Sequence, residues 1–144
     1  MGILKPLLLT MLTMLTLNAL PARAEDGLSR QLPCGSWARD IQPTEWGHVM
    51  HDCAAQGRYQ AALRAFYAYN SYILFDQQRV RDDSAHAIKD ELNLWILTGL
   101  SRDQFQALRP LFDQMRSRQG PTYRATCAAL QQLGPPKYHP DYMI

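Results

Sequence analysis

Residues 44–75, TEWGHVMHDCAAQGRYQAALRAFYAYNSYILF, decide the fold class of this chain. In the first half of this stretch, apolar residues recur at the i, i+3, i+4, i+7 and i+8 spacing of one helical face. These residues are Trp46, Val49, Met50, Cys53 and Ala54. Thr44 is expected to cap this helix, and Gly57 to end it. A second helix is expected from Tyr59 to about Phe75, so the stretch predicts two helices joined by a tight turn.

The rest of the chain continues the helical pattern. A third helix is expected over residues 84–98, a fourth over 101–115 and a fifth over 121–133. The fourth begins at a capping-box pattern, a serine followed three residues later by a glutamine, and Pro110 is expected to kink or split it. No strand pattern is found, so the predicted class is all-α, a small single-domain bundle of four to five helices.

The first 24 residues have the layout of a secretory signal peptide. Lys5 precedes an apolar stretch over residues 6–20, and Ala22 and Ala24 are the small residues expected before a cleavage site. We therefore expect cleavage after Ala24 and a periplasmic or secreted protein with no membrane span in its mature chain. The predicted organisation is a signal peptide (1–24), an extended N-terminal arm (25–43), a helical domain (44–134) and an irregular C-terminal tail (135–144).

The charge balance argues against a nucleic-acid partner. The chain has 15 basic and 13 acidic residues, but Lys5 and Arg23 belong to the expected signal peptide, which leaves 13 of each sign. Neutralising nucleic-acid phosphates requires clustered lysine or arginine, and the sequence has no such cluster. The remaining length fits one domain with one modest core.

Cys34, Cys53 and Cys127 are disulfide candidates, because the expected compartment is oxidising. Cys53 and Cys127 both lie on the apolar faces of their predicted helices, so a bridge between these two is favoured. A bridge between Cys34 and Cys53 is the rival, and either pairing leaves one cysteine over. No C-x-x-C pair is present for a zinc ribbon or a thioredoxin-type site.

Three polar side chains lie close together on the first predicted helix. His48, His51 and Asp52 are of the types that bind zinc or a similar metal, and helical spacing brings them within reach of one cation. This face points away from the apolar one and lacks a further ligand. We interpret it as a solvated polar face and expect no metal or other cofactor.

The second predicted helix is apolar nearly all round. Behind its main face runs a stripe of small and aromatic residues, Ala61, Ala65, Ala68 and Tyr72. Such a helix is either central to its domain or docks against a partner, so burial and a homodimer through this stripe both remain open. Asn70 falls in the middle of the main apolar face and is expected either to be hydrogen-bonded inside or to mark a site.

No motif specifies a catalytic nucleophile, a carboxylate pair, a phosphate-binding loop or a Cys–His pair. We therefore expect a protein that is not an enzyme and that binds another protein, as a periplasmic inhibitor, an immunity-type protein or an accessory subunit. One alternative is a small-ligand or metal-binding periplasmic protein. Another is an enzyme whose site assembles only in three dimensions.

Four residues are the expected contact residues for a protein partner. Arg79 and Arg81 lie in a charged segment between helices, and their guanidinium groups can fork onto carboxylates. Tyr138 and Tyr142 lie in the tail, and tyrosine rings suit interfaces. The other interpretation of the charged segment is a plain connector, and that of the tail is a plug folded back over the core.

Overall fold

The computed structural model describes residues 30–144, so the expected signal peptide and its cleavage site lie outside the described residues. The described chain forms five α-helices, two short 3-10 helices and no strands, which confirms the all-α prediction. The α-helices are α1 (Pro43–Ala55), α2 (Tyr59–Arg79), α3 (Ile88–Thr98), α4 (Arg102–Gln114) and α5 (Pro121–Leu133). The 3-10 helices are η1 (Asp83–Ala87) and η2 (Asp141–Met143).

The first helix begins earlier than expected, because Pro43 and not Thr44 sets its start. Proline suits the first helical position, where its fixed φ is already helical and its missing N–H needs no partner. Gln42 is the N-cap residue, and its backbone N–H donates to Oε2 of Glu45 over 2.8 Å. The expected boundary between arm and helical domain therefore moves to Pro43.

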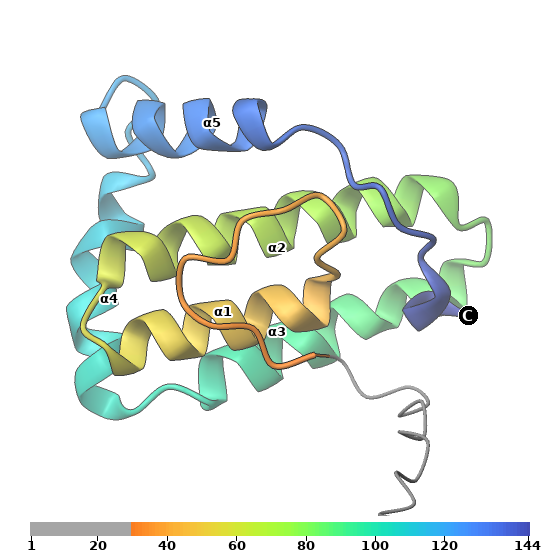
Figure 1. Ribbon diagram of the computed structural model, residues 1–144, viewed down its shortest axis with the longest axis horizontal. Coiled ribbons are helices and arrows are strands. Elements are labelled where there is room, and N and C mark those ends of the chain that lie inside the picture. The colour runs from red at the N-terminus through yellow and green to blue at the C-terminus, as the bar shows by residue number, and fades with distance from the viewer. Residues whose placement is uncertain (1–29) are drawn as a thin grey trace, which may run out of the picture.

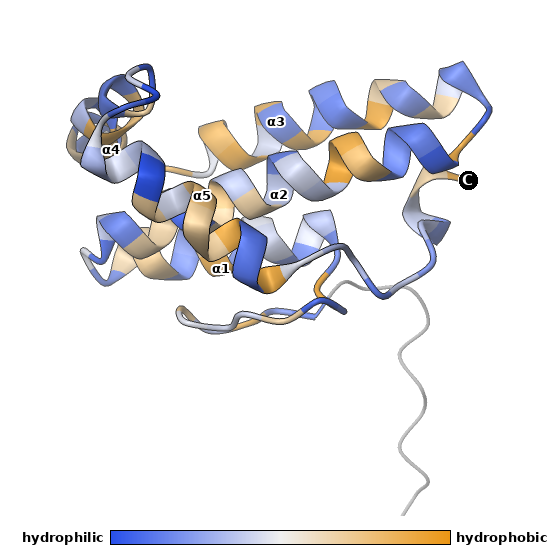
Figure 2. Ribbon diagram, turned by 90° about the horizontal axis from the view of Figure 1, so that it is seen from above, coloured by the Kyte–Doolittle hydropathy of each residue, from blue (hydrophilic) through white to orange (hydrophobic). Residues whose placement is uncertain are grey.

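Helices α1 and α2 form an antiparallel hairpin, and the other elements surround α2 (Figure 1). In that view α5 runs above α2, α4 stands across one end, and the described part of the arm crosses the front of the hairpin. Seen from above, α3 lies on the side of α2 opposite to the arm (Figure 2). Ala65, Ala68 and Tyr72 of the small-residue stripe are at most 3% exposed. These three residues are therefore buried within the chain, Ala61 is partly buried, and α2 is the central helix.

A glycine on α1 allows α3 to approach closely. A β-carbon at Gly47 would lie 2.3 Å from Cζ3 of Trp95 and 3.0 Å from Cγ1 of Ile96. The first distance is far shorter than van der Waals contact, so the missing side chain makes room for α3. Ile96 is fully buried as a result, while the Trp95 ring is held against α1.

The start of α4 follows the predicted capping box. The Ser101 hydroxyl accepts a hydrogen bond from the backbone N–H of Gln104 over 3.2 Å, and Oε1 of Gln104 accepts one from the backbone N–H of Ser101 over 2.8 Å. The helix then continues through Pro110 to Gln114, so the expected split does not occur. Pro110 is exposed, which leaves its pyrrolidine ring in solvent rather than in the core.

The C-terminal tail folds back along α2, as the plug interpretation predicts. The hydroxyl of Tyr72 donates to the carbonyl of Gly134 over 3.0 Å, and the backbone N–H of Lys137 donates to the carbonyl of Arg39 over 2.7 Å. Near the end of the tail, Met143 is buried. The tail thus connects α5 to the arm and then to the last turns of α2 (Figure 1).

Candidate functional site

The disulfide joins Cys34 of the arm to Cys53 of α1. The favoured pairing of Cys53 with Cys127 is therefore wrong, and the rival pairing is correct. Cys53 lies on the side of α1 that the arm covers, whereas Cys127 is a free, half-buried thiol on α5. Apolar spacing shows which face of a helix is buried but not which segment covers it. The bridge fits a location in an oxidising compartment.

Three of the four expected contact residues meet around a buried carboxylate. Asp76, in the last turn of α2, is completely buried. Its Oδ2 accepts hydrogen bonds from the hydroxyls of Tyr138, over 2.8 Å, and Tyr142, over 2.6 Å. Its Oδ1 pairs with the guanidinium of Arg79, which also donates to the backbone carbonyl of Tyr138 over 3.1 Å. We call these four residues the Asp76 cluster.

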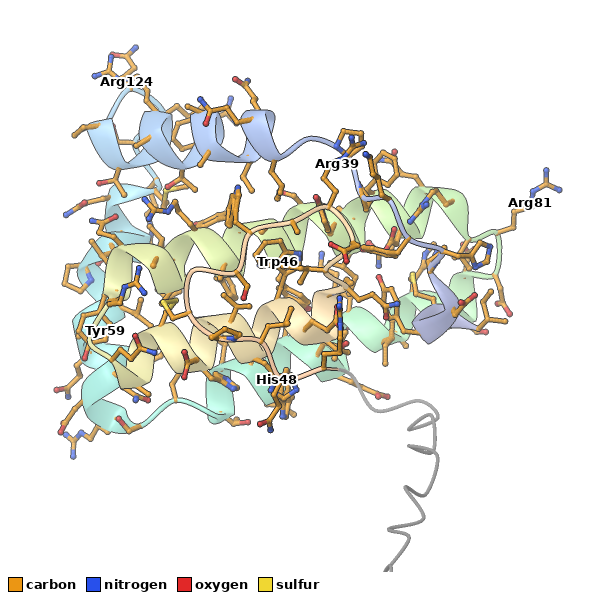
Figure 3. The ribbon with its side chains drawn as sticks, in the orientation of Figure 1. Arg39, Trp46, His48, Tyr59, Arg81 and Arg124 are labelled. Atoms are coloured by element: carbon orange, nitrogen blue, oxygen red, sulfur yellow. A yellow bond between two sulfur atoms is a disulfide. The ribbon has the colours of Figure 1, made fainter. Side chains whose placement is uncertain are left out.

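The Asp76 cluster is an internal network rather than an open surface. Burial raises the pKa of both Tyr138 and Tyr142, and the hydrogen bond to Asp76 raises it further, because ionised tyrosine would face a carboxylate. Arg81 behaves differently, since its side chain extends away from the molecule (Figure 3). Of the four expected contact residues, Arg81 is thus the one whose charged group has no protein partner among the described residues.

Sequence reasoning missed Asp76, because the second helix was expected to end at about Phe75. A signal was present, because Asp76 follows Tyr72 and Ile73 at the i+4 and i+3 positions of a buried helical face. A polar residue continuing such a face is expected to be buried and to need partners. Those partners come from the tail, which has no periodicity that could have placed them.

The polar face of α1 holds the arm and α3. Nε2 of His51 lies 2.7 Å from the carbonyl oxygen of Ile96, while Oδ2 of Asp52 accepts the backbone N–H of Cys34 over 2.6 Å. The rings of His48 and His51 each meet the Trp95 ring edge-on, with centroids 5.1 Å apart. Burial, and secondly the neighbouring His51, lower the pKa of His48. No group of three metal-binding side chains occurs among residues 30–144.

Asn70 is hydrogen-bonded inside its own helix. Its side-chain amide donates to the carbonyl of Phe66 over 2.9 Å, one turn earlier on α2. Of the two roles expected for Asn70, an internal hydrogen bond or a functional site, the structure shows the hydrogen bond.

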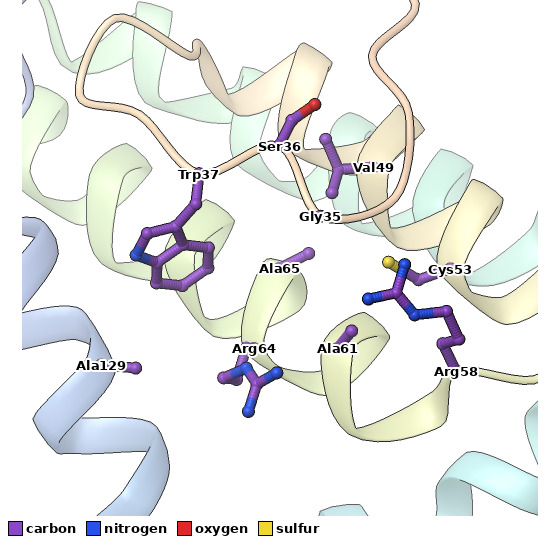
Figure 4. Close-up of a pocket in the computed structure, with 10 residues that line it drawn as sticks. All are labelled: Gly35, Ser36, Trp37, Val49, Cys53, Arg58, Ala61, Arg64, Ala65 and Ala129. Carbon is purple, nitrogen blue, oxygen red and sulfur yellow. The ribbon is translucent and has the colours of Figure 1, made fainter.

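A cavity of about 260 Å³ opens between the arm, α1, α2 and α5, and we call it the arm cavity (Figure 4). Two guanidinium groups line it, those of Arg58 at the start of α2 and Arg64 one to two turns later. Its apolar lining includes Trp37 of the arm and Ala129 of α5. No acidic residue contributes to its wall. Sequence reasoning did not find this site, because its residues come from four separate segments.

Helix α3 and the first turn of α4 carry a second notable surface. Four large apolar side chains within twelve residues remain in contact with solvent, and we call them the α3–α4 face: Leu94 (65% exposed), Trp95 (37%), Leu97 (37%) and Phe105 (45%). Leu94 and Leu97 are three residues apart and so lie on the same side of α3, away from the buried Leu92 and Ile96.

Comparisons with protein-family models, with curated proteins and with solved structures found no match to this chain. Among the helices of residues 30–144, none combines the length and the hydropathy needed to cross a membrane.

Proposed function

We propose that this chain acts by binding another protein and that the α3–α4 face is its main contact surface. The observation that carries the proposal is the exposure of Leu94, Trp95 and Leu97 on α3 and of Phe105 near the start of α4. Covering apolar surface is favourable by about 25 cal/mol per Å², so a partner that covers these side chains gains free energy. Single exposed leucines are common, but several on neighbouring turns together with a tryptophan are typical of an interaction site.

Trp95 is suited to act as the anchor of this contact. The rings of His48 and His51 meet it edge-on, and the Trp95 ring itself lies against Gly47 of α1. A tryptophan held in one orientation loses little conformational freedom on binding, and tryptophan is enriched among the residues that dominate interface energies. Leu94 and Leu97 flank it along α3 and extend the apolar area.

The geometry supports binding better than catalysis. Asp76, the most buried carboxylate, is saturated by Arg79, Tyr138 and Tyr142. His51 is held by a backbone carbonyl of α3. These groups have their partners within the chain, as structural groups do. We propose an exported inhibitor, immunity-type protein or accessory subunit of the periplasm, a location that the disulfide and the signal-peptide pattern favour.

Arg81 is proposed as a secondary contact. It lies in the segment between α2 and η1, at the end of the molecule where α3 begins (Figure 3). A partner that covers the whole length of α3 would reach it. Arg79, in contrast, is proposed to act on this surface only indirectly, because its guanidinium is engaged by Asp76.

The proposal is tested by recovering partners with the purified chain from extracts of the cells that make it and identifying them by mass spectrometry. Leu94→Asp combined with Leu97→Asp should abolish recovery of the specific partner. Leu74→Asp is the matched control, because Leu74 is also an exposed leucine (46%) but lies on α2. Thermal melting establishes that all variants are folded.

Recovery of the same partner by the wild-type chain and by the Leu94, Leu97 double variant would show that the α3–α4 face is not the contact surface. Failure of the wild-type chain to retain any protein in a defined ratio would argue against protein binding as such.

A further inference from the structure

We propose that the arm cavity binds a small organic anion, in which a carboxylate or phosphate group is attached to an aromatic or short aliphatic body. This inference goes beyond the proposed protein binding, because the arm cavity and the α3–α4 face share no residue. It rests on charge, on shape and on the way in which the arm is fixed.

The first argument is uncompensated positive charge in a concave site. Arg58 and Arg64 both line the cavity, and within the described chain neither guanidinium is paired with a carboxylate. Asp52 is the sequence neighbour of Cys53, which lines the cavity. Its carboxylate already accepts hydrogen bonds from the backbone N–H of Cys34 and the side-chain amide of Gln56. A guanidinium fork matches the oxygens of a carboxylate or phosphate, so the unused donors favour an oxyanion.

The second argument is that the cavity is fixed before any ligand arrives. The disulfide ties Cys34 to α1, and the next residue, Gly35, has a φ of +96°, a conformation that side chains disfavour. A β-carbon at Gly35 would stand 3.8 Å from a terminal nitrogen of Arg58, so the guanidinium lies directly against the arm. A site that is already formed loses little free energy to ordering when it binds.

The third argument concerns the uncharged part of the ligand. The indole of Trp37 extends from the arm toward α5, with Ala61 and Ala65 of α2 on the opposite side of the opening (Figure 4). The Trp37 ring packs edge-on against Trp46 with centroids 5.1 Å apart, yet it remains 37% exposed. The aromatic or short aliphatic body of the ligand can therefore contact the Trp37 ring while its oxyanion meets the two arginines.

The size of the cavity limits the ligand. Sites for drug-sized molecules measure about 300–1,000 Å³, and this one, at about 260 Å³, lies just below that range. A single ring bearing one acidic group fits these dimensions better than a nucleotide or a peptide.

Binding can be measured with defined probes on the purified chain. Benzoate and phenyl phosphate carry the proposed oxyanion on one ring, inorganic phosphate lacks the ring, and benzamide lacks the charge. We expect benzoate or phenyl phosphate to bind saturably by calorimetry, inorganic phosphate to bind more weakly, and benzamide not to bind. The preference between the two aryl anions identifies the acidic group. Trp37 fluorescence should change on binding, and that change should be lost in Trp37→Phe.

The decisive comparison uses two double variants of equal charge change. Arg58→Gln with Arg64→Gln should weaken aryl anion binding by about tenfold or more. Arg118→Gln with Arg124→Gln should leave it unchanged, because both arginines are exposed outside the cavity lining and Arg124 points away from it (Figure 3). Ala129→Leu narrows the cavity without altering charge and should also weaken binding.

Three results would overturn the inference: no saturable binding of either aryl anion, equal weakening by the two double variants, or equal affinity for inorganic phosphate and the aryl anions. None of these results bears on the α3–α4 face, whose test uses variants of α3.

Discussion

The hydroxyl of Tyr142 donates to Oδ2 of Asp76 over 2.6 Å, although 66 positions separate the two residues in the sequence. Tyr138 donates to the same oxygen, and Arg79 occupies the other one. The tail thereby supplies two of the three groups that stabilise the buried charge of Asp76. The contact that holds the tail down is also the contact that keeps the end of α2 in the core.

Replacing Asp76 by alanine is expected to lower the free energy of unfolding by about 2–4 kcal/mol. Removing one member of a buried ion pair usually costs about 3–5 kcal/mol, but Arg79 is 32% exposed and water can solvate it in part. Urea denaturation measures the effect. Asp83→Ala is the control, because its side chain is 99% exposed. Similar losses in both variants would contradict a special role of the Asp76 cluster.

Two neighbouring arginines should behave differently on substitution. Arg79→Gln leaves the Asp76 carboxylate without its cation and should destabilise the fold by about 2–4 kcal/mol. Arg81→Gln should leave stability unchanged, because its side chain is in solvent. Denaturation of the two single variants makes the comparison. A stable Arg79 variant would show that Tyr138 and Tyr142 alone suffice for Asp76.

The double substitution of Arg79 and Arg81 is consequently a poor test of partner binding. Loss of binding in that variant would reflect a weakened fold as much as a lost contact. Arg81→Gln alone separates the two effects, and if Arg81 contributes, it should weaken partner recovery without lowering the melting temperature.

Reduction of the Cys34–Cys53 disulfide should lower the free energy of unfolding by about 3 kcal/mol, given the 19-residue separation of its cysteines. Cys34→Ser combined with Cys53→Ser should have the same effect, whereas Cys127→Ser should be almost neutral. Peptide mapping of the non-reduced chain identifies the bridge directly. A fragment joining Cys53 to Cys127 would refute the observed pairing.

Stability should fall at alkaline pH. The folded-state pKa of Tyr72 is raised to about 12, by burial first, and those of Tyr138 and Tyr142 are also raised. In the unfolded chain these hydroxyls ionise near pH 10, so above that pH the unfolded state releases protons that the folded state retains. The stabilisation is therefore complete below about pH 10 and is lost as pH rises further.

Urea denaturation at a series of pH values between about 8 and 11 tests this expectation. Tyrosinate absorbance should appear together with unfolding rather than before it. Tyr138→Phe with Tyr142→Phe should give a shallower dependence on pH. Full ionisation of all seven tyrosines in a chain that stays folded would contradict the assignment.

The helices were predictable because their signals are local. The spacing of Trp46, Val49 and Met50 and the capping box at Ser101 depend on residues within one or two turns. The start of α1 was misplaced because Thr44 is a good cap in isolation, whereas Pro43 fits the first helical position even better.

The candidate sites were less predictable because they combine distant segments. The arm cavity brings Trp37 of the arm together with Arg58 and with Ala129 of α5, and no periodicity relates them. The same reason explains the disulfide. Helical spacing placed Cys53 on a buried face, but the segment that covers this face is an arm without regular structure.

The span between Asp76 and Tyr142 also sets an order of events during biosynthesis. Helices α1 and α2 are neighbours in sequence and can pair early, whereas Asp76 at the end of α2 gains its tyrosine partners only after Tyr138 and Tyr142 have been made. Until then the Asp76 carboxylate remains hydrated, and the amide hydrogens in the last turn of α2 should exchange rapidly with solvent. Tyr138 and Tyr142 thus determine when the last turn of α2 can become buried.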